Sequence, residues 1–332
     1  MMSSGLKDLG SGYVFSFIER LDHPLAGLCA GILITALIQS SSATTSVTVG
    51  LVAEGVIPLE TAIPIVMGAN IGTTITNLIV SLGQLTRRAE FERAFSAAVV
   101  HDVFNILTVC ILFPIQVATN FLGRLAMGIT CKFEFLGLFK YDSPVDYVTN
   151  PIIDLLDPVN PYFRIILSVF ILYVSLALIV KNMKKLIHGR IQSSITKTMG
   201  NPPASFLAGV GLTATVQSSS VTTSLLVPMV GADIITVEDA YPYMLGSNIG
   251  TTITAFIAAI AIGEEIAVAV AFSHFLFNVF GTLIWYPLKR VPITISKFLG
   301  EVARNHRIAI ILYVVSVFIL LPAVVLFLFG VL

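Results

Sequence analysis

Charged residues are scarce in this sequence. Asp, Glu, Lys and Arg make up 11% of its 332 residues, whereas a soluble domain has about 25%. Hydrophobic residues make up 56%. This composition excludes an ordinary water-soluble domain and indicates a protein that lies largely in lipid. The formal net charge is zero, so the basic excess that would indicate a nucleic-acid partner is also missing.

Cysteine is rare as well. Cys29, Cys110 and Cys131 lie far apart in the chain, which excludes the spacing of a redox or metal motif and favours a packing role. The first 23 residues have no basic segment followed by a cleavage site, so we expect an interfacial segment there rather than a removed signal peptide. Long uncharged runs are present instead, and the one at 308–332 is long enough for a spanning helix of about 20 residues.

The chain contains one pattern twice. The sequence QSSSATTS at 39–46 returns as QSSSVTTS at 217–224, and GANIGTTIT at 68–76 returns as GSNIGTTIT at 246–254. After a short deletion in the second copy, His101, Phe104 and Asn105 correspond to His274, Phe277 and Asn278. Because the matches extend over most of the apolar sequence, we predict an internally duplicated fold.

Each copy predicts the same series of elements. The apolar segments on either side of QSSS have about 14 residues or fewer, too short to cross about 30 Å of hydrocarbon, so we expect a re-entrant hairpin with QSSS at its tip. The next segment is long enough to span but should be broken midway by NIGTT, and two further spanning helices follow. The sequence therefore predicts an all-α polytopic membrane protein with a re-entrant hairpin, a broken transmembrane helix and two further transmembrane helices in each repeat. The expected ranges are, for the first copy, 25–53, 59–82, 95–117 and 163–180, and for the second, 204–231, 237–262, 266–288 and 308–329.

The predicted topology is inverted between the copies. Each copy crosses the membrane an odd number of times, so the second must start from the opposite side. The loop charges agree, since cytoplasmic loops carry excess Lys and Arg: the turn after the first broken helix holds Arg87, Arg88 and Arg93, whereas its counterpart holds Glu264 and Glu265. Hairpin one is then expected to open outside and hairpin two to the cytoplasm.

These expectations divide the chain into eight parts. They are an N-terminal interfacial segment (1–23), the repeat 1 transport core (24–118), an extracellular connector (119–160), the repeat 1 long helix (161–187), a cytoplasmic linker (188–202), the repeat 2 transport core (203–288), a cytoplasmic connector (289–305) and the repeat 2 long helix (306–332).

The polar breaks supply groups for both an anion and a cation. The short helices that begin near Ala43 and Val221 should point their amino ends at the QSSS tips, which makes an anion site without a basic residue. Sodium prefers oxygen ligands, which the side chains of the NIGTT segments and nearby carbonyl groups provide. The cation candidates from this argument are Asn70, Thr73, Asn248 and Thr251.

Asp102 stands out as a carboxylate inside an apolar helix. Ionisable residues within a membrane indicate function by default, and the corresponding residue of the second copy is Phe275. The alternative is that Asp102 lies near the interface or bonds to His101. Because only the first copy has a carboxylate at this position, the sequence favours one charged cation site over two equal sites.

Other readings of the motifs stay open at this point. One QSSS in a membrane helix is more often a hydrogen-bonded helix contact, and NIGTT alone can be a packing kink; two copies in register favour a binding site. An intramembrane serine hydrolase could use Ser42 with His101, but the sequence lacks a GxSxG elbow and hydrolysis gives no reason to duplicate the serine. A channel is the third alternative.

With QSSS, GxNIGTT and HDxFN present in two copies, the chain resembles the type II sodium-dependent phosphate cotransporter family. The resemblance runs from about Pro24 to near the C-terminus. It implies that phosphate contacts the two tips, and it adds sodium ligands and a charge-determining role for Asp102. The implied phosphate residues are Gln39, Ser40, Ser41, Ser42, Gln217, Ser218, Ser219 and Ser220. The implied sodium residues are Gln84, Asp102, Asn105, Ser247 and Thr251.

The resulting prediction is a secondary transporter that brings inorganic phosphate into the cell with sodium by alternating access, with net movement of charge. The alternative is a sodium symporter for another oxyanion or a small carboxylate. Sodium is the coupling ion and no cofactor is expected; the partners are phosphate, sodium and the lipid bilayer, and a homodimer is left open. The family's animal members have a large glycosylated loop, and since 119–160 has no N-glycosylation sequon, we expect a bacterial plasma membrane.

Overall fold

The computed structural model describes residues 23–135 and 198–331, with isolated positions between 160 and 178. Its regular elements are helices, and the described residues include no strand. In the first copy they are α3 (Pro24–Ile38), α4 (Ser41–Ala53), α5 (Leu59–Thr73), α6 (Ile75–Ser81), the 3-10 turn η1 (Leu82–Gln84), α7 (Arg88–Thr119) and α8 (Phe121–Phe135). In the second they are α12 (Pro202–Val216), α13 (Ser219–Ser224), α14 (Leu226–Gly231), α15 (Val237–Gly250), α16 (Thr252–Ile262), α17 (Glu265–Trp285), α18 (Arg290–Asn305), α19 (Arg307–Val315), the π-helical η2 (Ser316–Leu320) and α20 (Leu321–Leu328).

Both QSSS sequences form the turn between two short helices. Each hairpin begins with a proline in its first helical turn, where the missing amide proton costs nothing. The first helix ends at a glutamine in the left-handed region, Gln39 with φ 57° and Gln217 with φ 56°. The next helix then begins at a serine cap, Ser40 or Ser218. The helix–turn–helix geometry agrees with the sequence; the position of these hairpins in a bilayer stays a prediction.

The interruption of the long helices is narrower than the sequence predicts. We expected a break over the whole polar sequence NIGTT, but Asn70–Thr73 belong to α5 and only Thr74 separates α5 from α6. Likewise Thr251 alone separates α15 from α16. Both threonines keep right-handed helical angles, so each segment continues in nearly the same direction after the break. Polar side chains in this sequence do not by themselves unwind the backbone.

Two segments expected to be connectors contain helices. Residues 289–305 hold α18, and residues 119–160 begin with α8. Both helices are amphipathic, with polar residues on one face. A search for long uninterrupted apolar stretches does not detect such helices, because their apolar residues recur at the helical period instead of forming one run. Helix α7 also begins at Arg88, ahead of the predicted Phe95. Much of the predicted connector, the long helix at 163–180 and the linker at 188–202 fall outside the described residues.

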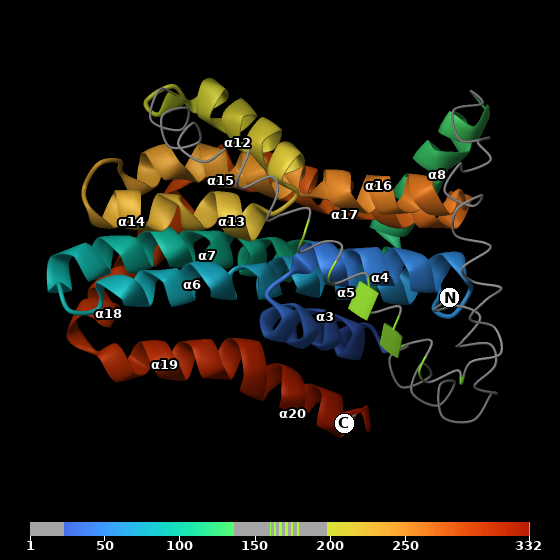
Figure 1. The fold of residues 1–332 in the computed structure, drawn as a ribbon, viewed down its shortest axis with the longest axis horizontal. Helices are drawn as coiled ribbons and strands as arrows, with labels where there is room; N and C mark the ends of the chain where they lie inside the picture. The colour runs from blue at the N-terminus through green and yellow to red at the C-terminus, as the bar shows by residue number, and fades with distance from the viewer. Residues whose placement is uncertain are drawn as a thin grey trace.

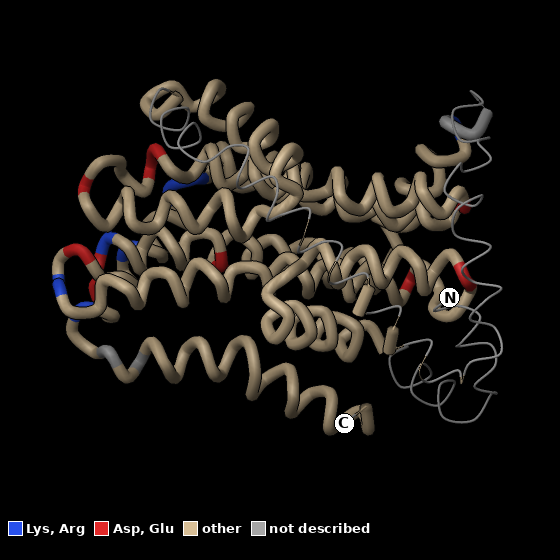
Figure 2. The backbone as a smooth tube through the Cα atoms, viewed as in Figure 1, with Lys and Arg blue, Asp and Glu red and all other residues tan. Residues whose placement is uncertain are grey.

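The two hairpins open at opposite ends of an elongated molecule, and their tips meet near its middle (Figure 1). The first opens toward the α4–α5 turn and the second toward the α14–α15 turn. Lys and Arg gather at the end where α6 turns into α7 and α18 into α19, while the stretch between the two ends is mostly uncharged (Figure 2). Ion pairs join the elements at this charged end: Arg304 with Glu92 at 2.9 Å and Lys297 with Glu238 at 2.6 Å. The orientation of the two copies relative to a membrane stays a prediction.

Five helical segments among the described residues are long and apolar enough to cross a membrane. They are Leu59–Gln84, Arg88–Thr119, Val237–Ile262, Glu265–Trp285 and Ile310–Leu328. The last is the most exposed, with 22% of its window buried inside the protein, as expected for a helix that faces lipid. These segments correspond to the predicted spans, apart from the one at 163–180.

Glycines allow the first helix of each hairpin to pack closely on the long helix behind it. A Cβ on Gly31 would overlap the carbonyl oxygen of Ile65, and one on Gly209 would overlap that of Tyr243. Gly68 and Gly246 face the backbone of the hairpin helix in the same manner. The same close crossing therefore occurs in both copies, and it fixes each hairpin to α5 or α15.

Two glycines in α12 provide a test of this crossing. Gly209→Ala is expected to lower stability by about 1–3 kcal/mol, because the added methyl group meets a backbone oxygen that cannot move alone. Gly211 has open space around it, so Gly211→Ala should raise stability by up to about 1 kcal/mol through helix propensity. The melting temperature of the purified protein in detergent measures both. Equal melting temperatures for the two variants would contradict the close crossing.

Candidate functional site

The QSSS tips of the two copies are in contact. The hydroxyl of Ser42 donates a hydrogen bond of 3.1 Å to the backbone oxygen of Gln217. Ser41, Ser42, Ser219 and Ser220 are all buried, whereas Gln39 is exposed. Residues separated by 175 positions in the chain thus form one small polar junction inside the protein.

The helices that begin at this junction leave amide groups free. The Ser40 hydroxyl accepts a hydrogen bond from the Ala43 amide at 3.2 Å, and the Ser218 hydroxyl accepts one from the Val221 amide at 3.4 Å. The amides just before these, at Ser41–Ser42 and Ser219–Ser220, have no partner within their own helices. Amide and hydroxyl donors from two directions therefore surround the junction. Such a set of donors suits an oxyanion.

A pair of threonines holds each hairpin closed beside its tip. Thr35 and Thr44 bond through their hydroxyls at 2.8 Å, and Thr213 and Thr222 do so at 2.7 Å. Ser247 lies 3.5 Å from the Thr222 hydroxyl, so it contacts the second hairpin. These matched pairs fix both tips in the same way.

A second polar cluster joins the copies deeper in the protein. The Nε2 atom of His101 lies 2.6 Å from Oδ1 of Asn248, whose amide group donates to Oδ1 of Asn105 at 3.2 Å. Asn105 in turn donates to the backbone oxygen of Asn70 at 2.9 Å. Each predicted cation residue of this cluster is buried. The structure therefore brings together three of the predicted sodium residues, Asn70, Asn105 and Asn248.

The equivalent contacts are made in the opposite direction, from copy two to copy one. The Nε2 atom of His274 lies 3.4 Å from Oδ1 of Asn70, and the Asn278 amide donates to the same oxygen at 3.3 Å. These are the positions that correspond to His101 and Asn105. The two histidine contacts are therefore equivalent, with the one from His274 longer, whereas the asparagine bond reverses its donor: Asn278 donates, but its counterpart Asn105 accepts.

The hydrogen bonds around His101 and His274 differ because one neighbouring residue is not the same in the two copies. In copy one, the amide of Asn77 lies 3.2 Å from Nδ1 of His101 and bonds Thr223 in the second hairpin. The corresponding residue in copy two is Ala255, and Nδ1 of His274 and Oδ1 of Asn278 are buried without a hydrogen-bond partner. Unpaired buried acceptors are costly and require a ligand or water to satisfy them.

Asp102 is fully buried and is held by two hydroxyl groups. Thr74, the residue that breaks the α5–α6 helix, donates to Oδ1 at 3.0 Å. Tyr313 of α19 donates to Oδ2. The alternative that Asp102 bonds to His101 is therefore wrong, because the His101 ring nitrogens contact Asn77 and Asn248 instead. The depth of Asp102 in the membrane stays a prediction.

The remaining predicted cation residues divide into two groups. Thr73 and Thr251 are buried near the helix breaks, and Thr73 donates to the Ala69 carbonyl, which leaves its oxygen able to accept a cation. Gln84 lies elsewhere: it packs against Gly231 at the charged end, about 20 Å from Asn70 along the helix. Its Oε1 atom is buried without a partner. Gln84 therefore lies apart from the cluster of Asn70, Asn105 and Asn248 in this structure, and its predicted role as a sodium ligand stays a prediction.

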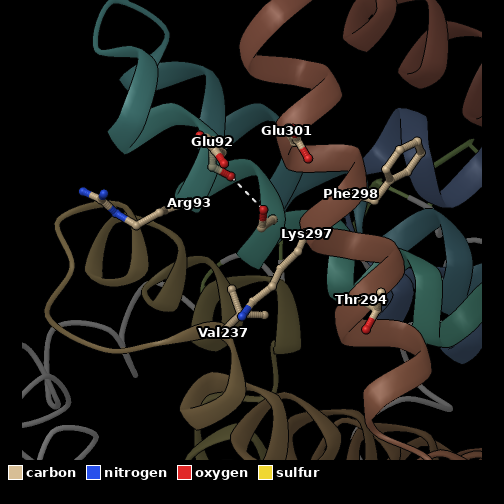
Figure 3. Close-up of a pocket in the computed structure, with 8 residues that line it drawn as sticks. Glu92, Arg93, Val237, Thr294, Lys297, Phe298 and Glu301 are labelled. Carbon is tan, nitrogen blue, oxygen red and sulfur yellow. Dashed lines mark hydrogen bonds between the residues drawn. The ribbon is translucent and has the colours of Figure 1, made fainter.

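A hollow of about 420 Å³ lies at the same charged end, between α7, α15 and α18 (Figure 3). Its lining includes Glu92, Arg93 and Lys297, and the side chain of Lys297 extends toward Val237. Both cations already have partners, since Lys297 pairs with Glu238 and Arg93 donates to the Gly231 carbonyl at 2.8 Å. The hollow is therefore a poorer anion site than the junction of the tips.

Sequence reasoning did not assign several residues that the structure places in these clusters, among them Thr74, Asn77 and Tyr313. Thr74 follows NIGT directly and Asn77 comes three residues later, so their spacing along the helix could have assigned them to the same face. Tyr313 gave no signal, because it lies in a long apolar run and contacts Asp102 from 211 positions away.

Comparison with known proteins identifies the family of this chain. Residues 1–140 and 171–299 match the model of the family described as Na+/Pi-cotransporter. The chain is 34% identical to sodium-dependent phosphate transport protein 2A of Rattus norvegicus over 95% of its length. It is 32% identical to sodium-dependent phosphate transport protein 2B of Homo sapiens over 98%. The chain spans 62% of the length of each relative. No solved structure matches the chain.

Proposed function

Because the chain belongs to the Na+/Pi-cotransporter family, we propose that it carries inorganic phosphate across a membrane together with sodium ions. The observation that carries this proposal is the contact between the two tips, Ser42 to the Gln217 carbonyl at 3.1 Å. A duplicated anion motif whose copies meet between two oppositely directed hairpins is the arrangement that a secondary transporter needs. The family is one of transporters and not of enzymes.

Phosphate is proposed to bind at the junction of the tips. Its oxygens would accept from the free amides of Ser41–Ser42 and Ser219–Ser220 and from the side-chain donors of Gln39–Ser42 and Gln217–Ser220, with no basic side chain required. A site without fixed positive charge releases its anion more readily than a site with arginine, which favours turnover. The same donors would accept other oxyanions of similar size, so arsenate is expected to compete with phosphate.

Sodium is proposed to bind beside the phosphate, at the breaks of the long helices. The proposed ligands are side-chain oxygens from both copies: Asn70, Thr73, Asp102, Asn105, Ser247, Asn248 and Thr251. The buried position of all these residues supports this assignment, because oxygen ligands removed from water hold a cation more strongly. The unpaired Oδ1 of Asn278 adds a further free acceptor in the same region.

The proposed cycle is alternating access with inverted topology. The hairpins would be re-entrant, with the first open to the outside and the second to the cytoplasm, so that each covers the site from one side. Lys and Arg at the end where hairpin two opens support that orientation. A bacterial plasma membrane remains the expected location.

Sodium-driven uptake of radiolabelled phosphate into proteoliposomes tests the function. We expect uptake with an inward sodium gradient, and background uptake when potassium or choline replaces sodium. Arsenate should inhibit, whereas sulfate and citrate should compete weakly. Inhibition by sulfate or citrate at lower concentration than phosphate would favour a transporter for another anion, and the absence of any sodium-dependent uptake would refute the proposal.

A further inference from the structure

Tyr313 connects the C-terminal helix to the buried carboxylate of Asp102. The segment from α19 to α20 is otherwise held by apolar contacts: Ile310 and Phe318 are buried in the main core, and α20 packs along α3. Its outer face is exposed, with Ile308 at 73% and Phe327 at 70%. Tyr313 places a hydroxyl group on the apolar inner face, and that group bonds a carboxylate.

The contact is made where a cation would bind. Asp102 Oδ1 accepts from Thr74 at the break of the long helix, and Oδ2 accepts from Tyr313. Both carboxylate oxygens are therefore occupied by donors in this structure. The proton that Tyr313 donates takes one lone pair of Oδ2 and carries partial positive charge, so it weakens the attraction of this oxygen for a sodium ion that approaches it.

We propose that sodium and the Tyr313 hydroxyl compete for Asp102, so that binding of the cation at this carboxylate releases α19 from the core. This inference rests on the proposed function, because it takes sodium as the cation. The helix has a structural feature that can accept the movement: the π-helical turn Ser316–Leu320 follows Tyr313 by three residues. Such turns have looser hydrogen bonding and often occur at functional sites.

Copy two cannot make the equivalent contact, because the residue that corresponds to Asp102 is Phe275, which packs against Phe256. Only the first copy can therefore link a carboxylate to a peripheral helix in this manner. Cation binding would therefore change the packing of a peripheral helix through the carboxylate of one copy and not through the equivalent residue of the other. Tyr313 acts here through Asp102 and is a positioning residue rather than a ligand.

Equilibrium binding of radioactive sodium to the purified protein, without phosphate, tests the competition. Tyr313→Phe removes the hydroxyl and keeps the ring, so the apparent sodium affinity is expected to rise roughly 10-fold, as for loss of a hydrogen bond to a charged group. Tyr241→Phe is the matched control: Tyr241 is also buried and its hydroxyl donates to the Trp285 carbonyl at 3.3 Å. Its sodium affinity should not change. In an Asp102→Asn background, Tyr313→Phe should produce no shift.

Hydrogen–deuterium exchange of residues 307–315 gives the second readout. Sodium should increase exchange there in the wild-type protein and have no such effect in Tyr313→Phe, where the helix is already released. Unchanged or weaker sodium binding in Tyr313→Phe would overturn the competition, and weaker binding would identify the hydroxyl as a ligand. Wild-type protein that binds no sodium would contradict the proposed function as well, which separates the two failures.

Discussion

Ser42→Asp is expected to lower sodium-driven phosphate uptake at least 100-fold. The side chain of Ser42 is buried at the junction of the tips, so the new carboxylate would lie close to the bound anion. The two negative charges of a divalent phosphate, about 5 Å from one carboxylate at an effective dielectric constant of about 20, give a repulsion of about 7 kcal/mol. Protonation of the carboxylate would relieve part of this, so the expected loss is smaller than the full Coulomb term.

Ser42→Asn is the matched control for this prediction. Asparagine has nearly the same volume as aspartate and keeps a donor for the anion, so its uptake should exceed that of the aspartate variant by more than 10-fold at equal amounts of protein. The twin substitutions Ser220→Asp and Ser220→Asn should show the same difference if both tips hold the anion. Equal uptake by the aspartate and asparagine variants at either position would exclude that tip from the phosphate site.

Asp102→Asn is expected to abolish the dependence of phosphate accumulation on membrane potential while uptake continues. One net charge that moves across 100 mV contributes about 2.3 kcal/mol, which corresponds to about a 50-fold change in the accumulation ratio. The amide has the shape of the carboxylate and can accept from Tyr313, so the fold should be kept. Loss of the charge should remove the cation that makes transport electrogenic.

Uptake into proteoliposomes with an imposed potassium diffusion potential, negative inside, measures this effect. The wild-type protein should accumulate more phosphate as the potential becomes more negative, and the Asp102→Asn protein should not respond. Asn105→Asp is a useful comparison, because it adds a carboxylate one turn away in α7 and should not restore the response when combined with Asp102→Asn. A full response in Asp102→Asn alone would show that another group sets the charge.

The sequence predicted local backbone structure best, where a residue type determines the conformation of its neighbours. Glutamine followed by serines between two short apolar segments predicted a hairpin with QSSS at its tip, and both turns have this helix–turn–helix geometry. The polar breaks were harder, because threonine can satisfy its own helix: Thr73 donates to Ala69 and remains helical. A local pattern therefore located the break but overestimated its length.

Contacts between distant segments were predictable only through the repeat. The duplication predicted two equivalent tips from oppositely directed hairpins, and the structure places these tips in contact. It could not predict Tyr313 on Asp102, because neither residue has an equivalent partner in the other copy, or the position of Gln84, which depends on where η1 ends against Gly231. These contacts depend on tertiary packing of the two halves, which no spacing in the chain encodes.

The central claim is that two copies of one motif hold a single phosphate ion between them. The location of bound arsenate, a phosphate analogue with anomalous scattering, tests it most directly in crystals grown with sodium. We expect one anomalous peak between Ser41–Ser42 and Ser219–Ser220, which should disappear when potassium replaces sodium. A peak at the charged end beside Arg93 and Lys297, with none between the tips, would contradict the claim.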